Sequence, residues 1–163
     1  MRGFILGFAA VCLAVALSIG GAKAQSVSEN PFDQIQRAAE LFGAGQRDEA
    51  AYLYYIAQLR VRIYIEARPD LPPSGAPALA GSLFEVVGRP INEWIGGDVD
   101  EWVSIMDRVL AWHAANDDAI TPKATYGDAH RTIVSGLRSF RNQVDGDRES
   151  IRAQREANGL PNR

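Results

Sequence analysis

The segment that decides the fold is residues 47–67, which read RDEAAYLYYIAQLRVRIYIEA. It holds four of the five tyrosines and contains neither glycine nor proline. It is also too long and too rich in helix-forming residues for a β-strand. At 100° per residue its apolar side covers about 200° of the helix circumference. A helix that is apolar over so wide an arc needs several neighbours, so we predict a central helix that other helices surround.

Arg60 lies near the middle of this predicted apolar arc. Because arginine stays charged in proteins, a buried Arg60 needs a carboxylate or carbonyl partner inside the fold. Glu85 and Glu93, on other predicted helices, are the candidate partners. Two interpretations stay open. Arg60 either forms a buried or snorkelling contact that fixes helix register, or lines an anion-accepting cleft with tyrosines as its walls.

Three further residues are candidates for binding. Tyr55 lies on the polar arc of the same helix near Arg62, so we expect its ring to be partly exposed. An exposed tyrosine beside an arginine is a common interface anchor, although the ring could instead cover a neighbouring loop. Trp94 lies in a short segment between glycines, where it either packs in the core or forms the lip of a groove. The hypothetical binding set is thus Tyr55, Arg60, Arg62 and Trp94.

The first 24 residues have the pattern of a secretory signal peptide. A short cationic start precedes an uncharged apolar run, and Ala22-Lys23-Ala24 then forms an A-x-A cleavage site. We predict that residues 1–24 are removed, which leaves a soluble periplasmic or secreted protein without a stable membrane anchor. The alternative is a retained anchor, for which the apolar run is short.

The composition after cleavage limits the partners. The only cysteine, Cys12, lies in the predicted signal peptide, so the mature chain needs neither a disulfide nor a thiolate metal site. Loss of two of the 17 basic residues, Arg2 and Lys23, leaves 15 against 20 acidic residues, a formal charge of −5. Because the arginines alternate with acidic residues, no basic patch of nucleic-acid type forms. We expect another protein or a small anionic ligand as the partner, and no nucleic acid.

Proline and glycine breaks divide the rest of the mature chain into further helices. We predict them over residues 31–42, 77–88, 90–95, 98–115 and 128–145. Asn30 and Asp98 are the expected N-caps of the first and fourth of these helices. Gly136, on the narrow apolar stripe of the last one, should permit a close helix approach. The prediction is an all-α fold, a single compact bundle of five to six helices over 25–145, with a charged helical extension or tail over 146–163.

The first two helices carry a resemblance to a known family. Residues 41–50 read LFGAGQRDEA, and the wider set Ala38, Gly45, Ala50, Tyr54 and Ala57 resembles a tetratricopeptide repeat over about residues 34–62. The match occurs once, and Arg62 lies where that family has a proline. Because one unit cannot form a solenoid, the resemblance implies an antiparallel N-terminal helical hairpin and no particular ligand.

No motif for catalysis or metal binding is present. The two histidines, His113 and His130, lie on inward faces at a spacing that matches no metal site. The nucleophile and nucleotide-binding motifs of common enzymes are also missing, so we expect no catalytic residue, metal or cofactor. The predicted function is an exported, non-catalytic protein- or ligand-binding module, one form being an inhibitor or immunity-type protein of the bacterial envelope. The alternative is a carboxylate-dependent enzyme acting on glycan, with Glu85 and Glu93 as its pair.

Overall fold

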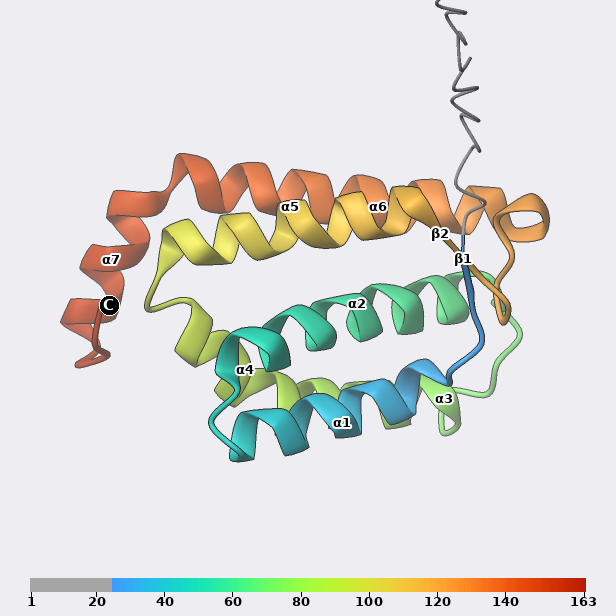
Figure 1. Cartoon of the computed structure of the whole chain (residues 1–163), viewed down its shortest axis with the longest axis horizontal. Coiled ribbons are helices and arrows are strands. Elements are labelled where there is room, and N and C mark those ends of the chain that lie inside the picture. The colour runs from blue at the N-terminus through green and yellow to red at the C-terminus, as the bar shows by residue number, and fades with distance from the viewer. Residues whose placement is uncertain (1–24) are drawn as a thin grey trace, which may run out of the picture.

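The computed structural model describes residues 25–163, and over this range the protein has the predicted all-α fold (Figure 1). The predicted signal peptide lies outside the described residues. The helices are α1 (Pro31–Gly43), α2 (Arg47–Glu66), α3 (Ala76–Leu83), α4 (Arg89–Ile95), α5 (Val99–Ala115), α6 (Lys123–Gly146) and α7 (Arg148–Ala157). A π-helical segment, η1 (Phe84–Gly88), joins α3 to α4 without a break.

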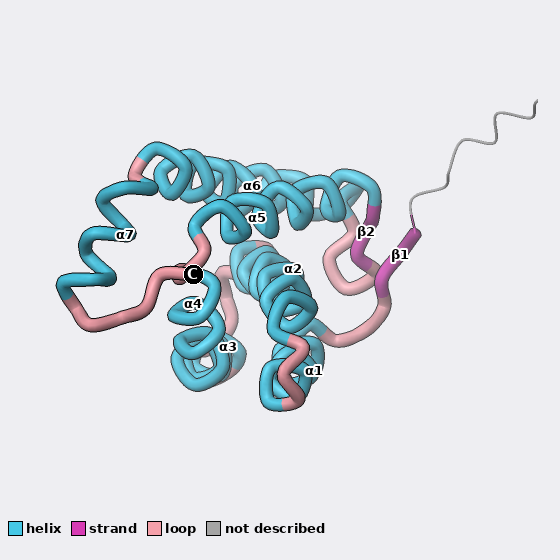
Figure 2. Tube along the Cα trace, turned by 60° about the vertical axis from the view of Figure 1, so that its left-hand side comes forward, coloured by secondary structure: helices cyan, strands magenta, loops and turns pink. Residues whose placement is uncertain are grey.

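Helix α2 is the central element, as predicted. It contacts α1, α4, α5 and α6, and Figure 2 shows it enclosed by these helices when the molecule is viewed nearly along α2. Its buried side chains point in several directions: Ala50, Ala51, Tyr54, Tyr55, Ile56, Ala57, Leu59, Arg60, Val61 and Ile63. Burial of so much apolar surface is the main source of stability in a domain of this size.

Helices α1 and α2 form a hairpin at one side of the fold (Figure 1). Helix α1 begins as predicted, with Pro31 in its first turn and the side chain of Asn30 accepting a hydrogen bond from Phe32 N at 2.9 Å. The turn between the helices places Gly45 at a φ of +82°, a conformation that favours glycine. This local chemistry sets where α1 ends and allows α2 to return beside it.

A second glycine allows α2 to pack closely on the segment from α3 to α4. Gly88, at the end of η1, faces the fully buried ring of Tyr54. A Cβ atom at this position would overlap the hydroxyl and the ring carbon of Tyr54. Close contact between the two helices therefore depends on the absence of a side chain at residue 88.

Helices α5 and α6 cover the opposite side of α2. Asp98 caps α5 as predicted, because its carboxylate accepts a hydrogen bond from Glu101 N at 3.0 Å. Helix α6 begins at Lys123, five residues before the predicted start, and is kinked at Tyr126, whose φ and ψ of −115° and 31° are not helical. The close approach expected at Gly136 is wrong, since a Cβ there would meet no atom within 4 Å. Open space lies beside this part of α6.

Two short strands tie the start of the described chain to the segment between α5 and α6. β1 (Gln25–Val27) pairs in parallel with β2 (Asn116–Asp118), with Gln25 opposite Asn116. The sequence predicted irregular structure in both places. Strands of three residues carry no periodic hydrophobic pattern, so this pairing was not predictable from alternation.

The charged C-terminal segment is helical and packs on the bundle. Arg148 and Arg152 of α7 form ion pairs with Asp100 of α5. After α7 the chain turns back, and Arg163 N donates a hydrogen bond to Gly97 O at 2.7 Å. Over residues 25–163, no helix combines the length and apolarity that crossing a membrane requires.

Candidate functional site

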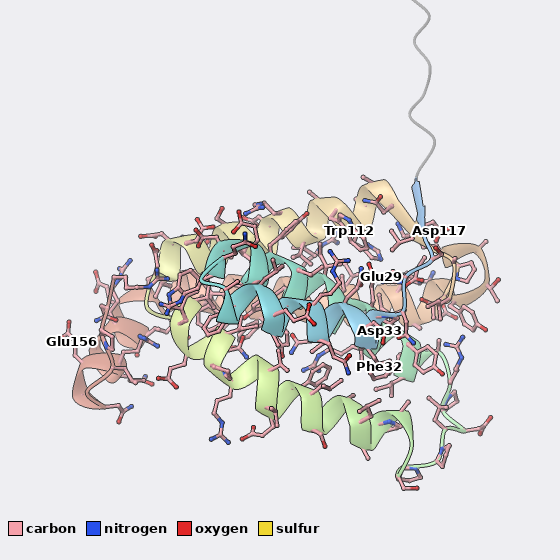
Figure 3. The ribbon with its side chains drawn as sticks, turned by 60° about the horizontal axis from the view of Figure 1, so that its bottom comes forward. Glu29, Phe32, Asp33, Trp112, Asp117 and Glu156 are labelled. Atoms are coloured by element: carbon pink, nitrogen blue, oxygen red, sulfur yellow. The ribbon has the colours of Figure 1, made fainter. Side chains whose placement is uncertain are left out.

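Arg60 is buried, as predicted, with 2% of the residue exposed. Its Nε donates to Asp118 Oδ2 at 2.8 Å and its Nη2 donates to Asp118 Oδ1 at 3.0 Å. The guanidinium also donates to Gln34 Oε1 at 2.5 Å and to Glu29 O at 2.8 Å. Figure 3 shows Glu29 at the start of α1 and Asp117 of β2 at the same end of the molecule, far from Glu156 of α7. Arg60 therefore joins α2 to both segments.

The predicted partners of Arg60 are wrong. Glu85 is exposed and pairs with Arg89, and Glu93 is also exposed. The actual partner, Asp118, reaches Arg60 because β2 pairs with β1 beside the start of α1. Burial by itself would raise the pKa of Asp118, but the hydrogen bonds from Arg60 and from backbone N–H groups outweigh it and lower that pKa. Arg60 is thus a structural cation and does not line an open cleft.

An open groove lies between α2 and α6, and we call it the α2–α6 groove. Its volume is about 660 Å³. The wall from α6 consists of Thr132, Ile133, Gly136, Leu137 and Phe140, which recur at helical spacing on one face. The wall from α2 consists of Tyr55, Gln58, Leu59 and Arg62, and Asn92 and Trp102 line the end nearest α4.

Tyr55, Asn92 and Trp102 form a hydrogen-bonded trio at this end of the groove section. Tyr55 donates from its hydroxyl to Asn92 Oδ1 at 2.9 Å and accepts from Trp102 Nε1 at 2.5 Å. The Trp102 ring in turn packs edge-on against Phe140, with ring centroids 5.6 Å apart. Burial raises the pKa of Tyr55, so its hydroxyl keeps its proton at neutral pH. The trio is neutral and holds the Trp102 ring in one orientation.

The predicted partial exposure of Tyr55 is wrong, since only 4% of the residue is exposed. Its partners Asn92 and Trp102 come from α4 and α5, which cover the side of α2 that the helical wheel assigned to solvent. Tyr55 nevertheless lines the groove through its edge. Its role is to fix the groove wall, and it is not an exposed anchor.

Arg62 lies on the rim of the same groove. Its side chain is exposed, and its guanidinium lies 5.2 Å from the centroid of the Phe84 ring. Trp94 lies elsewhere, packed edge-on against Phe42 and covered by the guanidinium of Arg163 at 3.8 Å. Of the four predicted binding residues, the structure brings Tyr55 and Arg62 to one groove and places Arg60 and Trp94 away from it.

The groove continues toward α7. A second section of about 410 Å³ shares Asn92, Trp102 and Phe140 with the first, and its far wall includes Ile151 and Arg155 of α7. The lining residues of α6 now extend from Thr132 to Val144, a span of about 18 Å at 1.5 Å per residue, and Asp147 follows directly after the helix. The two sections form one elongated depression along α6.

The two histidines form a pair that links α5 to α6. His113 Nε2 lies 2.8 Å from His130 Nδ1, and His130 Nε2 lies 2.8 Å from Thr121 O. A carbonyl oxygen only accepts, so we assign the proton of His130 to Nε2 and infer that His113 donates to Nδ1. Burial and the nearby Lys123 ammonium lower the pKa of His113 to about 4. Among residues 25–163, no three His, Cys, Asp or Glu side chains gather in a way that could hold a metal ion.

Comparisons of the chain with protein-family models, with curated protein sequences and with solved structures found no match. The resemblance of residues 34–62 to a tetratricopeptide repeat therefore stays a prediction.

Proposed function

We propose that this chain is an exported, non-catalytic binding module and that the α2–α6 groove is its binding site. The observation that carries the proposal is the open face of α6. Ile133 and Leu137 are only partly buried, and Phe140 is 41% exposed. Large apolar side chains gathered in one depression, with a few polar groups at its ends, are typical of ligand sites.

The wall formed by Tyr55, Asn92 and Trp102 supports this proposal because it is ordered before any ligand arrives. The hydrogen bonds among Tyr55, Asn92 and Trp102 satisfy the buried polar atoms and fix the aromatic wall. A wall that keeps its shape loses little conformational freedom on binding, so more of the contact free energy appears as affinity.

The alternative function is a carboxylate-dependent enzyme acting on glycan, for which Glu85 and Glu93 are the predicted pair. The positions of these two residues do not support it. Glu85 projects into solvent beside Arg89. Glu93 lines a separate shallow depression near Trp94 and Arg163. Neither carboxylate lies on the α2–α6 groove. An inhibitor or immunity-type protein is one form of the proposed module, in which the groove would receive an apolar segment of the target.

The test fills the groove with a side chain of the protein itself. Gly136 lies on the α6 wall, and a Cβ atom there meets nothing within 4 Å, so Gly136→Trp should occupy the groove without disturbing the core. Ser135→Trp is the matched control, because Ser135 is exposed on the same helix but does not line the groove. The measurement is the fluorescence of N-phenylnaphthylamine, a neutral apolar probe, titrated with each protein.

We expect the wild type and Ser135→Trp to bind the probe alike. Gly136→Trp should bind it at least about tenfold more weakly, the equivalent of about 1.4 kcal/mol of lost apolar contact. Equal binding by Gly136→Trp and the wild type would place the probe elsewhere and contradict the proposal. Absence of binding by all three proteins would also contradict it.

A further inference from the structure

The polar groups of the α2–α6 groove indicate which class of ligand it accepts. Arg62 is the one charged residue of its main section, and no Asp or Glu contributes to that lining. Within residues 25–163, the arginines outside the core that pair with a carboxylate are Arg37, Arg89, Arg108, Arg131, Arg141, Arg148 and Arg152. Arg62 has no such partner, as is also true of the exposed Arg47 and Arg138, but of these three only Arg62 lines the main section, where it contacts the face of the Phe84 ring. A guanidinium that has no carboxylate partner can direct its N–H donors to an incoming anion.

Arg62 stands at one end of the groove, opposite Thr132. Helices α2 and α6 run in opposite directions, so the C-terminal half of α2 lies beside the N-terminal half of α6 (Figure 1). From that end the apolar residues Leu137 and Phe140 lead toward the α7 section. The main section therefore has a cationic end and an apolar floor, which is the complement of an amphiphile. The α7 section beyond it is lined mostly by polar residues, with Asp147 and Arg155 among them.

The floor favours an alkyl chain over an extended peptide. Its buried polar groups, the Tyr55 hydroxyl and the Trp102 indole N–H, are already bonded to each other and to Asn92. An extended peptide would leave its own N–H and C=O groups without partners there.

We infer that the ligand of the α2–α6 groove is a single-chain amphiphile with a carboxylate head, bound with the head at Arg62 and the chain along Leu137 and Phe140. This inference rests on the proposed function and names the ligand class of the same site. The chain would run from the Arg62 end toward Val144 and Ile151 in the α7 section.

The test compares decanoate with decanol, below any micelle concentration, by isothermal titration calorimetry on the mature chain. Decanoate should bind more tightly than decanol, and Arg62→Gln should weaken decanoate about tenfold or more while leaving decanol unchanged. Arg138→Gln is the matched control, because it removes the same charge from an exposed site on α6 that does not line the groove. From octanoate to dodecanoate, each added methylene should increase affinity about fourfold.

Several results would overturn the inference and still leave the proposed function standing. Equal affinities for decanol and decanoate, both abolished by Gly136→Trp, would show a groove without anion preference. A loss of decanoate affinity in Arg155→Gln but not in Arg62→Gln would place the head in the α7 section. Binding of an amphipathic helical peptide, blocked by Gly136→Trp, together with no binding of carboxylates, would identify a protein segment as the occupant. If the wild-type protein binds none of these ligands and does not bind the neutral probe, the proposed function is refuted as well.

Discussion

Replacing Arg60 by methionine should remove about 3–5 kcal/mol from the free energy of unfolding at neutral pH. Methionine is long and flexible but offers no donor, so the buried carboxylate of Asp118, 8% exposed, would lose its cation. Gln34 Oε1 and the Glu29 carbonyl would each lose a hydrogen bond as well. A buried charge left without a partner is the largest part of this cost.

The stability lost in Arg60→Met should become smaller as the pH falls. In the wild type the pKa of Asp118 lies below its ordinary value of 3.8, so its stabilising effect is present above that value and is lost only as the pH falls through the lowered pKa. In Arg60→Met, burial without the cation raises the pKa of Asp118 above that ordinary value. Asp118 of the variant therefore binds its proton at a higher pH than Asp118 of the wild type. Protonation removes the unpaired buried charge, so the difference in unfolding free energy between variant and wild type becomes smaller as the pH falls.

Urea unfolding followed by circular dichroism measures this effect. Arg89→Met is the control, because Arg89 pairs with Glu85 in solvent and its loss should change stability by no more than about 0.5 kcal/mol. The double variant Arg60→Met/Asp118→Leu should recover part of the loss, since it removes the unpaired charge. A loss below about 1 kcal/mol in Arg60→Met, or purely additive effects in the double variant, would show that Arg60 does not stabilise the buried carboxylate of Asp118.

Two further predictions concern packing and pH. Gly88→Ala should destabilise the protein by about 1–3 kcal/mol, because its methyl group overlaps the buried Tyr54. Thermal unfolding would show this loss, with partial recovery when Tyr54→Phe removes the hydroxyl, and an unchanged midpoint would contradict it. The pKa of His113 is lowered from 6.5 to about 4. The contribution of neutral His113 to the free energy of unfolding is therefore complete above pH 6.5 and is lost as the pH falls toward 4. His113→Gln, whose amide can still donate to His130, should show a smaller loss of stability over that interval in urea titrations, whereas identical pH profiles would exclude this contribution.

The central helix and the burial of Arg60 were predictable because both depend on local periodicity. A helix with so wide an apolar arc must lie inside, and a residue in the middle of that arc is buried whatever its chemistry. The N-caps Asn30 and Asp98 were predictable for the same reason, since capping depends on a few neighbouring residues.

The partner of Arg60 was not predictable, because it depends on contacts between distant segments. Asp118 lies 58 residues away in a segment that reads as a loop, and the short strands that position it have no sequence signature. Tyr55 was misplaced for a related reason, since the wheel of α2 does not show that α4 and α5 cover its polar arc. The groove depends on which face of α6 stays uncovered, and that follows only from the arrangement of all the helices.

An NMR titration of the isotope-labelled protein with decanoate reports directly on which residues the ligand contacts. We expect the largest shifts on the Trp102 indole N–H, the Gly136 amide and the Arg62 guanidinium, and we expect Gly136→Trp to abolish them. Shifts centred on Trp94 or on the buried surroundings of Arg60, or saturable binding that leaves Trp102 and Gly136 unperturbed, would contradict the assignment of the α2–α6 groove as the binding site.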